Sequence, residues 1–295
     1  MQTRNIARLE SLRAKAAATT ATKKFEDDST LWKPTKDKLG NSKNLIRFLP
    51  EPKGEDTPFV MYFHHAFQAP SGKWLIDLCP STLHTSGYPS DHCPICGLVN
   101  GLYRTGREDD KAVASKMKRT KVWMTNILVV TDGAKPEHNG NVYKYSFGLK
   151  QWEKLAAMLI PDDESDAPLD IFDPVEGANF QLVTQKVGGY INYDKSKFSK
   201  VSRIGTDEEI DAVLAKLHPL ATAVHPSRFK SKAELSYRLE FVMNSKAKPA
   251  DDDGVDYSPV TSKARVAKTT APAQQEADDD NEAMFAEMVA QNKGE

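Results

Sequence analysis

The sequence predicts an α+β protein that is mainly β. Between Asn44 and Gly148, short runs rich in Val, Ile, Leu and aromatic residues alternate with Pro, Gly and Asp, which is typical of strands joined by turns. The clearest helix-start motifs come later, after residue 200. The mean hydropathy is −0.55 although the chain has 12 Phe and 9 Tyr, which indicates one sizeable core with polar ends outside it.

Six segments have the length and composition expected of strands. Asp132-Gly133 and Asn139-Gly140 separate two of them and predict a hairpin. The expected strands are Leu45–Leu49, Phe59–Phe67, Trp74–Leu78, Val122–Thr131, Val142–Phe147 and Ala178–Val187.

Helices are expected as additions to this β region. One lies around Lys150–Leu159. Two more have capping boxes, in which a Ser or Thr is followed three residues later by Glu, directly before an amphipathic run. These are Thr206-x-x-Glu209 before Ile210–Leu217 and Ser231-x-x-Glu234 before Leu235–Met243.

Both ends of the chain differ in composition from the middle. Residues 1–24 contain six basic side chains and one acidic one, with Ile6, Leu9 and Leu12 at helical spacing, so they are expected to form a basic arm that orders against a partner. A frayed, solvated terminus is the alternative. Residues 248–295 are rich in Asp, Ala, Pro and Thr, which predicts a disordered linker and an acidic tail.

The net charge of −1 hides an uneven distribution. Residues 251–295 carry 11 acidic and 4 basic side chains, which leaves 36 basic and 30 acidic side chains in residues 1–250. A basic body with an acidic tail suggests a polyanionic ligand and a tail that competes for the same surface. No apolar run approaches 18 residues, so we expect a soluble protein with no membrane span.

The three cysteines of the chain lie close together in the sequence, as Cys79 and the pair Cys93 and Cys96. The C-x-x-C spacing with a third Cys and nearby histidines predicts one tetrahedral zinc site. Adjacent strand residues point to opposite faces, so only one of His64 and His65 can reach the ion. His84 and His92 also lie near the cysteines, although His92 directly precedes one of them.

A structural role for this zinc is favoured over a catalytic one. The sequence has no H-x-E and no H-E-x-x-H motif, and Pro94 follows the first cysteine of the pair instead of preceding it, so the deaminase and metalloprotease patterns are absent. Four protein ligands also leave no open coordination position. The alternatives are three unrelated thiols or a disulfide framework, and the odd number of cysteines argues against the second.

Basic and aromatic residues interleave in three segments. Four cations in residues 116–121 precede Trp123, the residues Tyr143, Tyr145 and Phe147 share one strand face, and residues 188–198 again mix Tyr with Lys. This combination suits single-stranded nucleic acid, since bases stack on rings while cations follow the phosphates. The alternative is that the tyrosines pack in the core and the charges form a solvated face.

Several motifs together resemble the zinc-containing single-stranded DNA-binding protein of T-even-type tailed phages, the helix-destabilising protein of their replisome. The resemblance covers about residues 25–245. The motifs are NLIRFLP at 44–50, PF at 58–59 leading to HAF at 65–67, GKW at 72–74, Cys79 with CPIC at 93–96, WMTNILVV at 123–130, YKYSFG at 143–148 and EGANF at 176–180.

The resemblance implies a fold and a set of site residues. It implies an OB-type barrel core at 25–247 with an inserted zinc subdomain at about 60–125 and a basic, aromatic-lined cleft between them. It selects His65, with Cys79, Cys93 and Cys96, as the ligands of one structural Zn²⁺. The DNA-facing positions that it implies are Arg47, Trp74, Tyr103, Lys116, Lys118, Arg119, Lys121, Trp123, Tyr145, Tyr190 and Tyr193.

Two positions depart from the family pattern. Val122 stands where the family has a tyrosine before the tryptophan, so one stacking contact is missing. The family's amino-terminal motif for cooperative assembly is a compact basic run followed by Ser or Thr, whereas the basic residues of the arm are spread out here, and Lys118-Arg119-Thr120 is more compact.

The expected function is therefore that of a non-enzymatic, sequence-independent protein that coats single-stranded DNA in the cytoplasm of the infected bacterial host. Self-association along DNA would involve the arm at 1–24. In the tail, the apolar stripe of Met284, Phe285, Met288 and Val289 follows three aspartates and is expected to recruit replication and recombination proteins. The alternatives are a zinc-dependent nuclease or deaminase and a zinc-stabilised scaffold that does not bind DNA.

Overall fold

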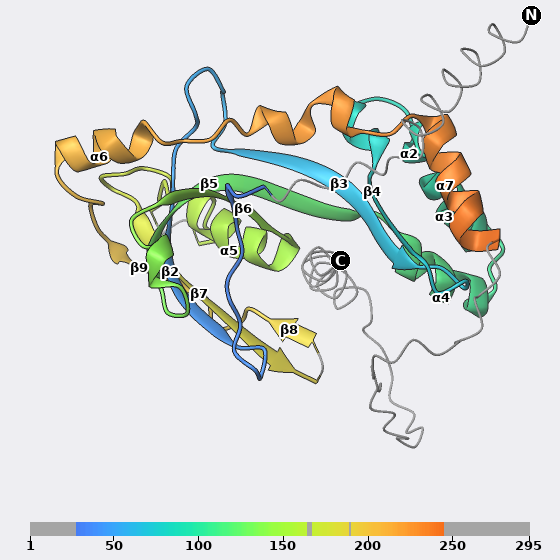
Figure 1. Cartoon of the computed structure of the whole chain (residues 1–295), viewed down its shortest axis with the longest axis horizontal. Coiled ribbons are helices and arrows are strands. Elements are labelled where there is room, and N and C mark those ends of the chain that lie inside the picture. Colours follow the sequence, from blue (N-terminus) through green and yellow to red (C-terminus); the bar gives the residue numbers. More distant parts are fainter. Residues whose placement is uncertain (1–27, 164–166, 189, 245–295) are drawn as a thin grey trace, which may run out of the picture.

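A sheet of hydrogen-bonded strands and two groups of helices make up the fold (Figure 1). The computed structural model describes residues 28–163, 167–188 and 190–244 of the chain. The predicted arm at 1–24 and tail at 248–295 lie outside the described residues. The mixed α+β class with a strand-rich sheet is confirmed.

The longest strand of the described residues, β5 (Thr120–Asp132), organises the sheet. It pairs in antiparallel fashion with β2 (Ser42–Phe48), β3 (Phe59–Gln68) and β6 (Val142–Phe147). The partners divide its length, because β3 pairs with residues 120–125 and β2 with residues 127–132. One strand therefore joins two parts of the fold.

The other strands extend the sheet from these four. β2 also pairs with β7 (Ala178–Val187), which in turn pairs with β8 (Tyr190–Asn192) and β9 (Lys197–Val201). β3 pairs with β4 (Trp74–Leu78), and the short β1 (Leu31–Trp32) runs parallel to β6. The expected bounds of β4, β6 and β7 are confirmed, as is the hairpin between β5 and β6.

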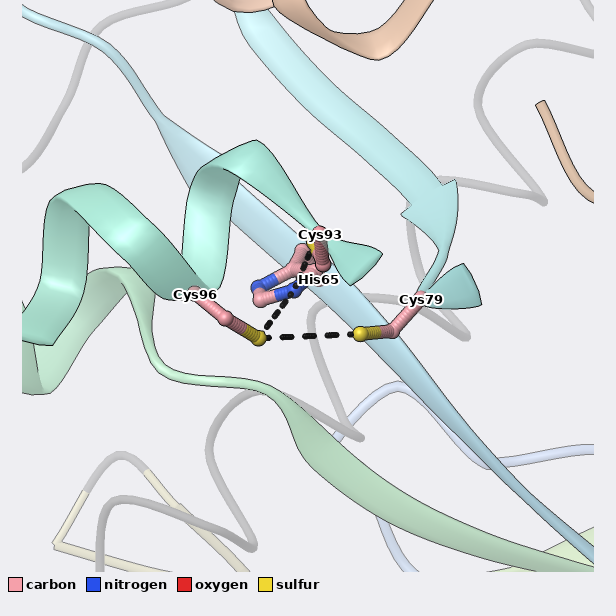
Figure 2. Close-up of side chains that lie close together, drawn as sticks. All are labelled: His65, Cys79, Cys93 and Cys96. Carbon is pink, nitrogen blue, oxygen red and sulfur yellow. Dashed lines mark hydrogen bonds between the residues drawn. The ribbon is translucent and has the colours of Figure 1, made fainter. Parts of the chain in front are cut away.

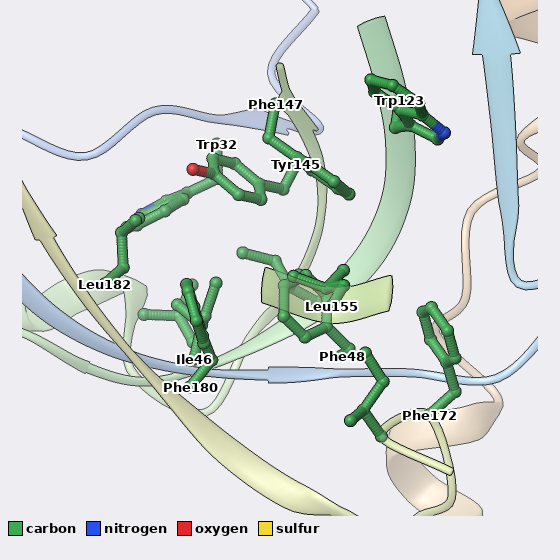
Figure 3. Packing of buried hydrophobic residues seen from close by; sticks show 13 residues of the cluster. Trp32, Ile46, Phe48, Trp123, Tyr145, Phe147, Leu155, Phe172, Phe180 and Leu182 are labelled. Carbon is green, nitrogen blue, oxygen red and sulfur yellow. The ribbon is translucent and has the colours of Figure 1, made fainter. Parts of the chain in front are cut away.

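An aromatic core lies between the sheet and α5 (Leu149–Leu159), as Figure 3 shows. Phe48 is fully buried at its centre, with its ring centroid 5.6 Å from that of Phe180 and 6.0 Å from that of Phe147. Rings packed at such distances add roughly 0.5–1.5 kcal/mol per pair beyond the burial of their area.

A second hydrophobic cluster lies around the carboxyl-terminal end of β3, and it contains the three cysteines. The helices that contribute to it are α3 (Pro94–Arg104), α4 (Glu108–Met117) and α7 (Lys232–Asn244), with the short α2 (Pro89–His92) beside them. An ion-pair group joins β4 to α7 and to the residues just before it, because the buried carboxylate of Asp77 contacts Arg238 on α7 and Lys230 two residues before its start.

α3 and α4 were not expected from the sequence, since residues 94–117 fall within the stretch that was predicted to be mostly strands. Their signals are electrostatic and conformational. Pro94 is the first residue of α3, a position at which proline is favoured. α4 has three acidic residues in its first turn and Lys116 in its last, and these charges stabilise the helix by interacting with its dipole.

The later helices agree with the sequence. α6 (Asp207–Leu214) begins with the predicted capping box, in which Thr206 and Glu209 each accept a hydrogen bond from the other's amide. Ser231 and Glu234 do the same at the start of α7. Short 3-10 helices complete the described elements at Pro80–Leu83, Pro136–His138, Ala221–Val224 and Pro226–Arg228. Within residues 28–163, 167–188 and 190–244, no helix combines the length and the apolar character that a bilayer-spanning segment needs.

The hairpin between β5 and β6 is fixed by the buried carboxylate of Asp132. It accepts hydrogen bonds from Trp32 Nε1 at 3.1 Å, from His138 Nδ1 at 2.9 Å, and from the amides of Ala134 and Lys135 at 3.0 Å. Burial acts to raise the pKa of Asp132, but these hydrogen bonds lower it more, so that its pKa lies below the ordinary value.

The variant Asp132→Asn should lower the free energy of unfolding by about 1–3 kcal/mol at pH 7, because the donors lose a charged acceptor. The folded-state pKa is depressed, so the wild-type advantage is present above about pH 4 and is lost as the pH falls through the folded pKa. Urea unfolding between pH 7 and pH 3 measures it, with the exposed Asp56→Asn as the control. A difference that stays constant with pH would contradict this role.

Candidate metal centre and nucleic-acid interface

Four buried side chains meet between β3, β4 and α3 (Figure 2). The ligand atoms of His65, Cys79, Cys93 and Cys96 all lie within 4.8 Å of one another. The Cys79 and Cys96 sulfurs are 3.7 Å apart, and His65 Nε2 lies 3.5 Å from Cys93 Sγ and 3.6 Å from Cys96 Sγ. Three sulfurs and one imidazole nitrogen at these distances could hold one metal ion.

Local structure explains why these residues converge. β3 and β4 pair so that His65 lies opposite Asp77, and Cys79 follows directly after the end of β4. The Cys79 amide donates to the Phe63 carbonyl at 2.8 Å, which holds the turn against β3. Cys93 is the cap residue of α3 and Cys96 lies in its first turn, so the C-x-x-C spacing directs both thiols to one side.

A backbone contact fixes the orientation of the His65 ring. Its Nδ1 lies 2.9 Å from the carbonyl oxygen of Met117, an arrangement in which Nδ1–H donates and Nε2 faces the thiols. Metal-binding histidines usually make an outer contact of this kind, because it sets the tautomer and the ring angle.

The electrostatics of the cluster favour a thiolate. The pKa of Cys79 lies well below its usual value because Cys93, Cys96 and His65 form hydrogen bonds with its sulfur. Burial acts to lower the pKa of His65, but its hydrogen bonds with Cys79 and Cys93 raise it to about 9. A thiolate is the form that binds metals, so Cys79 already has the protonation of a ligand. Hydrogen bonds with Cys79 and Cys93 raise the pKa of Cys96, and the raised pKa of His65 keeps its ring protonated, so a metal ion would displace protons from these two residues on binding.

The other histidines near the cysteines do not join this group. His64 is buried outside it, and burial lowers its pKa to about 4. The rings of His84 and His92 stack on each other, with centroids 3.7 Å apart. Of His64 and His65, only His65 lies with the three thiols, as the alternation of side chains along a strand requires.

The basic cluster, Lys116, Lys118, Arg119 and Lys121, starts where the metal centre ends. It runs from the last turn of α4 into the start of β5, on both sides of the Met117 carbonyl that contacts His65. Arg119 Nη1 donates to Ser81 Oγ at 2.6 Å, and the guanidinium lies 3.9 Å from the centre of the Phe63 ring. Lys121 Nζ is 5.4 Å from the Trp123 ring.

Four of the aromatic residues predicted to face DNA are at least partly accessible. Tyr190 on β8 is 55% exposed and Tyr103 on α3 is 42% exposed, whereas Trp74 and Tyr193 are half-buried. Tyr190 and Tyr103 therefore expose part of their rings to solvent.

Three other predicted DNA contacts lie in the interior. Arg47 donates to the carbonyls of Asp173 at 2.6 Å and Ser202 at 2.9 Å, Tyr145 donates to Gln151 Oε1 at 2.6 Å, and Trp123 is 4% exposed. All three side chains therefore contribute to the interior of the fold in this structure. Their contact with DNA stays a prediction and gains no support from their placement.

Two residues near the site were not found from the sequence. Trp152 on α5 stacks on Trp123 with ring centroids 5.0 Å apart, and the amphipathic pattern of its helix offered a signal. Ser81 lies 3.0 Å from Cys79 Sγ, and only its position two residues after a cysteine pointed to it.

Comparisons with known proteins identify a family and relatives of this chain. The chain matches a family described as gp32 DNA binding protein like over residues 40–243. It is 40% identical over 227 residues to the single-stranded DNA-binding protein of Enterobacteria phage T2, covering 75% of this chain and 72% of the relative. The protein of the same name from Enterobacteria phage T4 is 39% identical over 225 residues, covering 74% and 72%.

A shorter relative, the single-stranded DNA-binding protein of Enterobacteria phage RB70, is 36% identical over 99 residues, covering 33% of this chain and 78% of the relative. The family match spans β2 to β9, the cluster of His65 with the three cysteines, and α7 nearly to its end. The chain therefore belongs to the gp32-like family of DNA-binding proteins, and the resemblance read from its motifs is confirmed.

Proposed function

We propose that this protein binds single-stranded DNA without sequence preference, coats it and removes its secondary structure during phage replication, recombination and repair. The observation that carries the proposal is the family match over residues 40–243, with relatives from phages T2 and T4 that are named single-stranded DNA-binding proteins. The phage relatives also support action in the cytoplasm of the infected bacterial host.

The described surface supports this function physically. The cations at 116–121 can neutralise phosphates, and the open rings of Tyr103 and Tyr190 can stack on bases. Stacking of this kind contributes roughly 1–3 kcal/mol per base and tolerates any sequence, because every base has a flat aromatic face.

The finer architecture is also a proposal. We assign the strands around β2, β5, β6 and β7 to an OB-type barrel within residues 25–247. We assign about residues 60–125 to a metal-stabilised subdomain inserted in it. The separate hydrophobic cluster around the cysteines supports this division, since a subdomain needs apolar packing of its own.

We propose Zn²⁺ as the ion and a structural role for it. Ligands at about 2.3 Å for sulfur and about 2.05 Å for nitrogen form a tetrahedron with edges of about 3.8 Å between sulfurs and about 3.6 Å between sulfur and nitrogen. The 3.7 Å separation of Cys79 and Cys96 and the 3.5–3.6 Å separations to His65 Nε2 fit these edges. His65, Cys79, Cys93 and Cys96 fill all four positions, as in structural zinc sites.

The two ends of the chain have proposed roles that rest on their sequences. Residues 1–24 would support self-association along DNA. The acidic residues of 248–295 would bind replisome and recombination proteins and compete with DNA for the basic surface, since 11 of the 41 acidic side chains lie beyond residue 250. The enzyme and scaffold alternatives gain nothing from the comparisons, because the matching family is one of DNA-binding proteins.

A fluorescence titration tests the function. Oligo-dT should bind more tightly than duplex DNA, and the logarithm of its affinity should fall with the logarithm of salt concentration at about −0.7 per contacted phosphate, hence roughly −3 for four cations. Lys121→Ala should reduce the steepness by about 0.7. The control Lys53→Ala changes an exposed lysine in the loop between β2 and β3. Equal affinity for both DNA forms, or indifference to salt, would overturn the proposal.

The metal assignment is tested by Cys93→Ser. We expect this variant to lose zinc and to melt about 10 °C lower, because binding free energy of a structural metal adds directly to folding free energy. Metal analysis and thermal unfolding provide the two measurements. His84→Ala is the matched control, since it removes a nearby side chain outside the group and should keep one equivalent of zinc. Full zinc content in Cys93→Ser would show that the ligand set is wrong.

The proposed competition by the tail is tested by ending the chain after Ala247. The shortened protein should bind oligo-dT several-fold more tightly at low salt, and the gain should shrink as salt rises, because the competing interaction is electrostatic. Replacing Asp278, Asp279 and Asp280 by Asn in the full chain should give part of the same gain. An unchanged affinity in both proteins would remove the competing role.

A further inference from the structure

Ser81 joins the metal centre to the basic cluster. Its side chain is buried in the 3-10 helix that follows Cys79, with its residue 6% exposed. Its hydroxyl oxygen lies 3.0 Å from Cys79 Sγ and accepts a hydrogen bond from Arg119 Nη1 at 2.6 Å. One hydroxyl group therefore contacts both a metal ligand and a cation of the proposed DNA surface.

The direction of these hydrogen bonds follows from the chemistry of a metal ligand. A thiolate that binds a metal carries no proton, so Cys79 can only accept, and Ser81 must donate to it. The lone pairs of the Ser81 oxygen then remain available to Arg119, which is a donor only. A filled metal site thus sets the hydroxyl in the orientation that Arg119 requires.

Other contacts hold Arg119 in the same place. One face of its guanidinium lies on the Phe63 ring, and Phe63 is itself fixed because its amide donates to Thr82 Oγ1 at 2.9 Å and its carbonyl accepts from the Cys79 amide. Two positions before Arg119, the Met117 carbonyl accepts from His65. The residues on both sides of Lys118 are therefore tied to metal ligands.

We propose that Ser81 is a positioning residue that couples the metal centre to phosphate binding by Arg119. Ser81 engages one of the five N–H groups of the guanidinium, and Phe63 fixes its plane, so the guanidinium is presented in one orientation. Pre-organisation of this kind lowers the entropy that a long side chain loses on binding a phosphate. The inference rests on the proposed function, since Arg119 must contact DNA.

A double-mutant cycle with oligo-dT at saturating zinc tests the coupling. Ser81→Ala should keep one equivalent of zinc, weaken binding about two- to tenfold, and reduce the steepness of the salt dependence by up to about 0.7. The double variant Ser81→Ala/Arg119→Ala should bind like Arg119→Ala alone, because Ser81 acts through Arg119. Ser81→Thr should restore binding, and Ser86→Ala, an exposed serine nearby, is the matched control.

Additive losses in the cycle, or wild-type binding by Ser81→Ala, would overturn the coupling while leaving single-strand binding by the wild type intact. Failure of the proposed function would instead show as absence of salt-dependent binding in the wild type itself. The two failures are thus distinguishable.

A reciprocal measurement covers the case in which Ser81→Ala does not fold. By linkage, Arg119→Ala should weaken zinc binding a few-fold in competition with a chelator, because it removes a partner of the ligand shell. Lys121→Ala should leave zinc affinity unchanged. Equal zinc affinities in both variants would overturn the coupling.

Discussion

The pairing of β5 with three neighbouring strands is the constraint on which the rest of the structure depends. Its first residues pair with β3 next to the cluster of His65 and the cysteines, its middle pairs with β6, and its last residues pair with β2 in the aromatic core. A one-residue slip of a strand exchanges its two faces, so the registers of all three pairs must agree. The metal centre and the aromatic core are consequently placed relative to each other by one continuous backbone.

The polar groups inside the fold keep this arrangement specific. Arg47 reaches two carbonyls across from β2, Asp132 gathers four donors at the hairpin, and Asp77 accepts two cations from the segment that carries α7. Each of these groups would be costly to bury without its partners, because an unpaired charge loses its hydration. Alternative packings of the same apolar residues would leave them unpaired.

Much of this fold could be predicted from local patterns, and the exceptions have physical causes. Capping boxes and the C-x-x-C pair act over a few residues, so Thr206, Ser231 and the cysteines were identified correctly. The period-2 pattern of β6 placed Tyr145 and Phe147 on one face, but it could not tell whether α5 covers that face. The burial of Arg47 could not be predicted from local patterns either, because the carbonyl acceptors that accommodate its charge lie 126 and 155 residues away in sequence.

The stack of Trp123 and Trp152 has a consequence for how the free protein meets its ligand. The flat surface of Trp123 is already covered by an indole from α5 that lies 6° from parallel, much as a nucleobase would lie. A base can stack on Trp123 only if it displaces the Trp152 ring, which requires part of α5 to move. If the helix stays in place, Trp123 supports Trp152 from inside the fold, and Trp152 is the ring nearer the solvent. In the free protein Trp123 therefore presents almost no ring surface to water, whereas the ring that covers it is partly exposed.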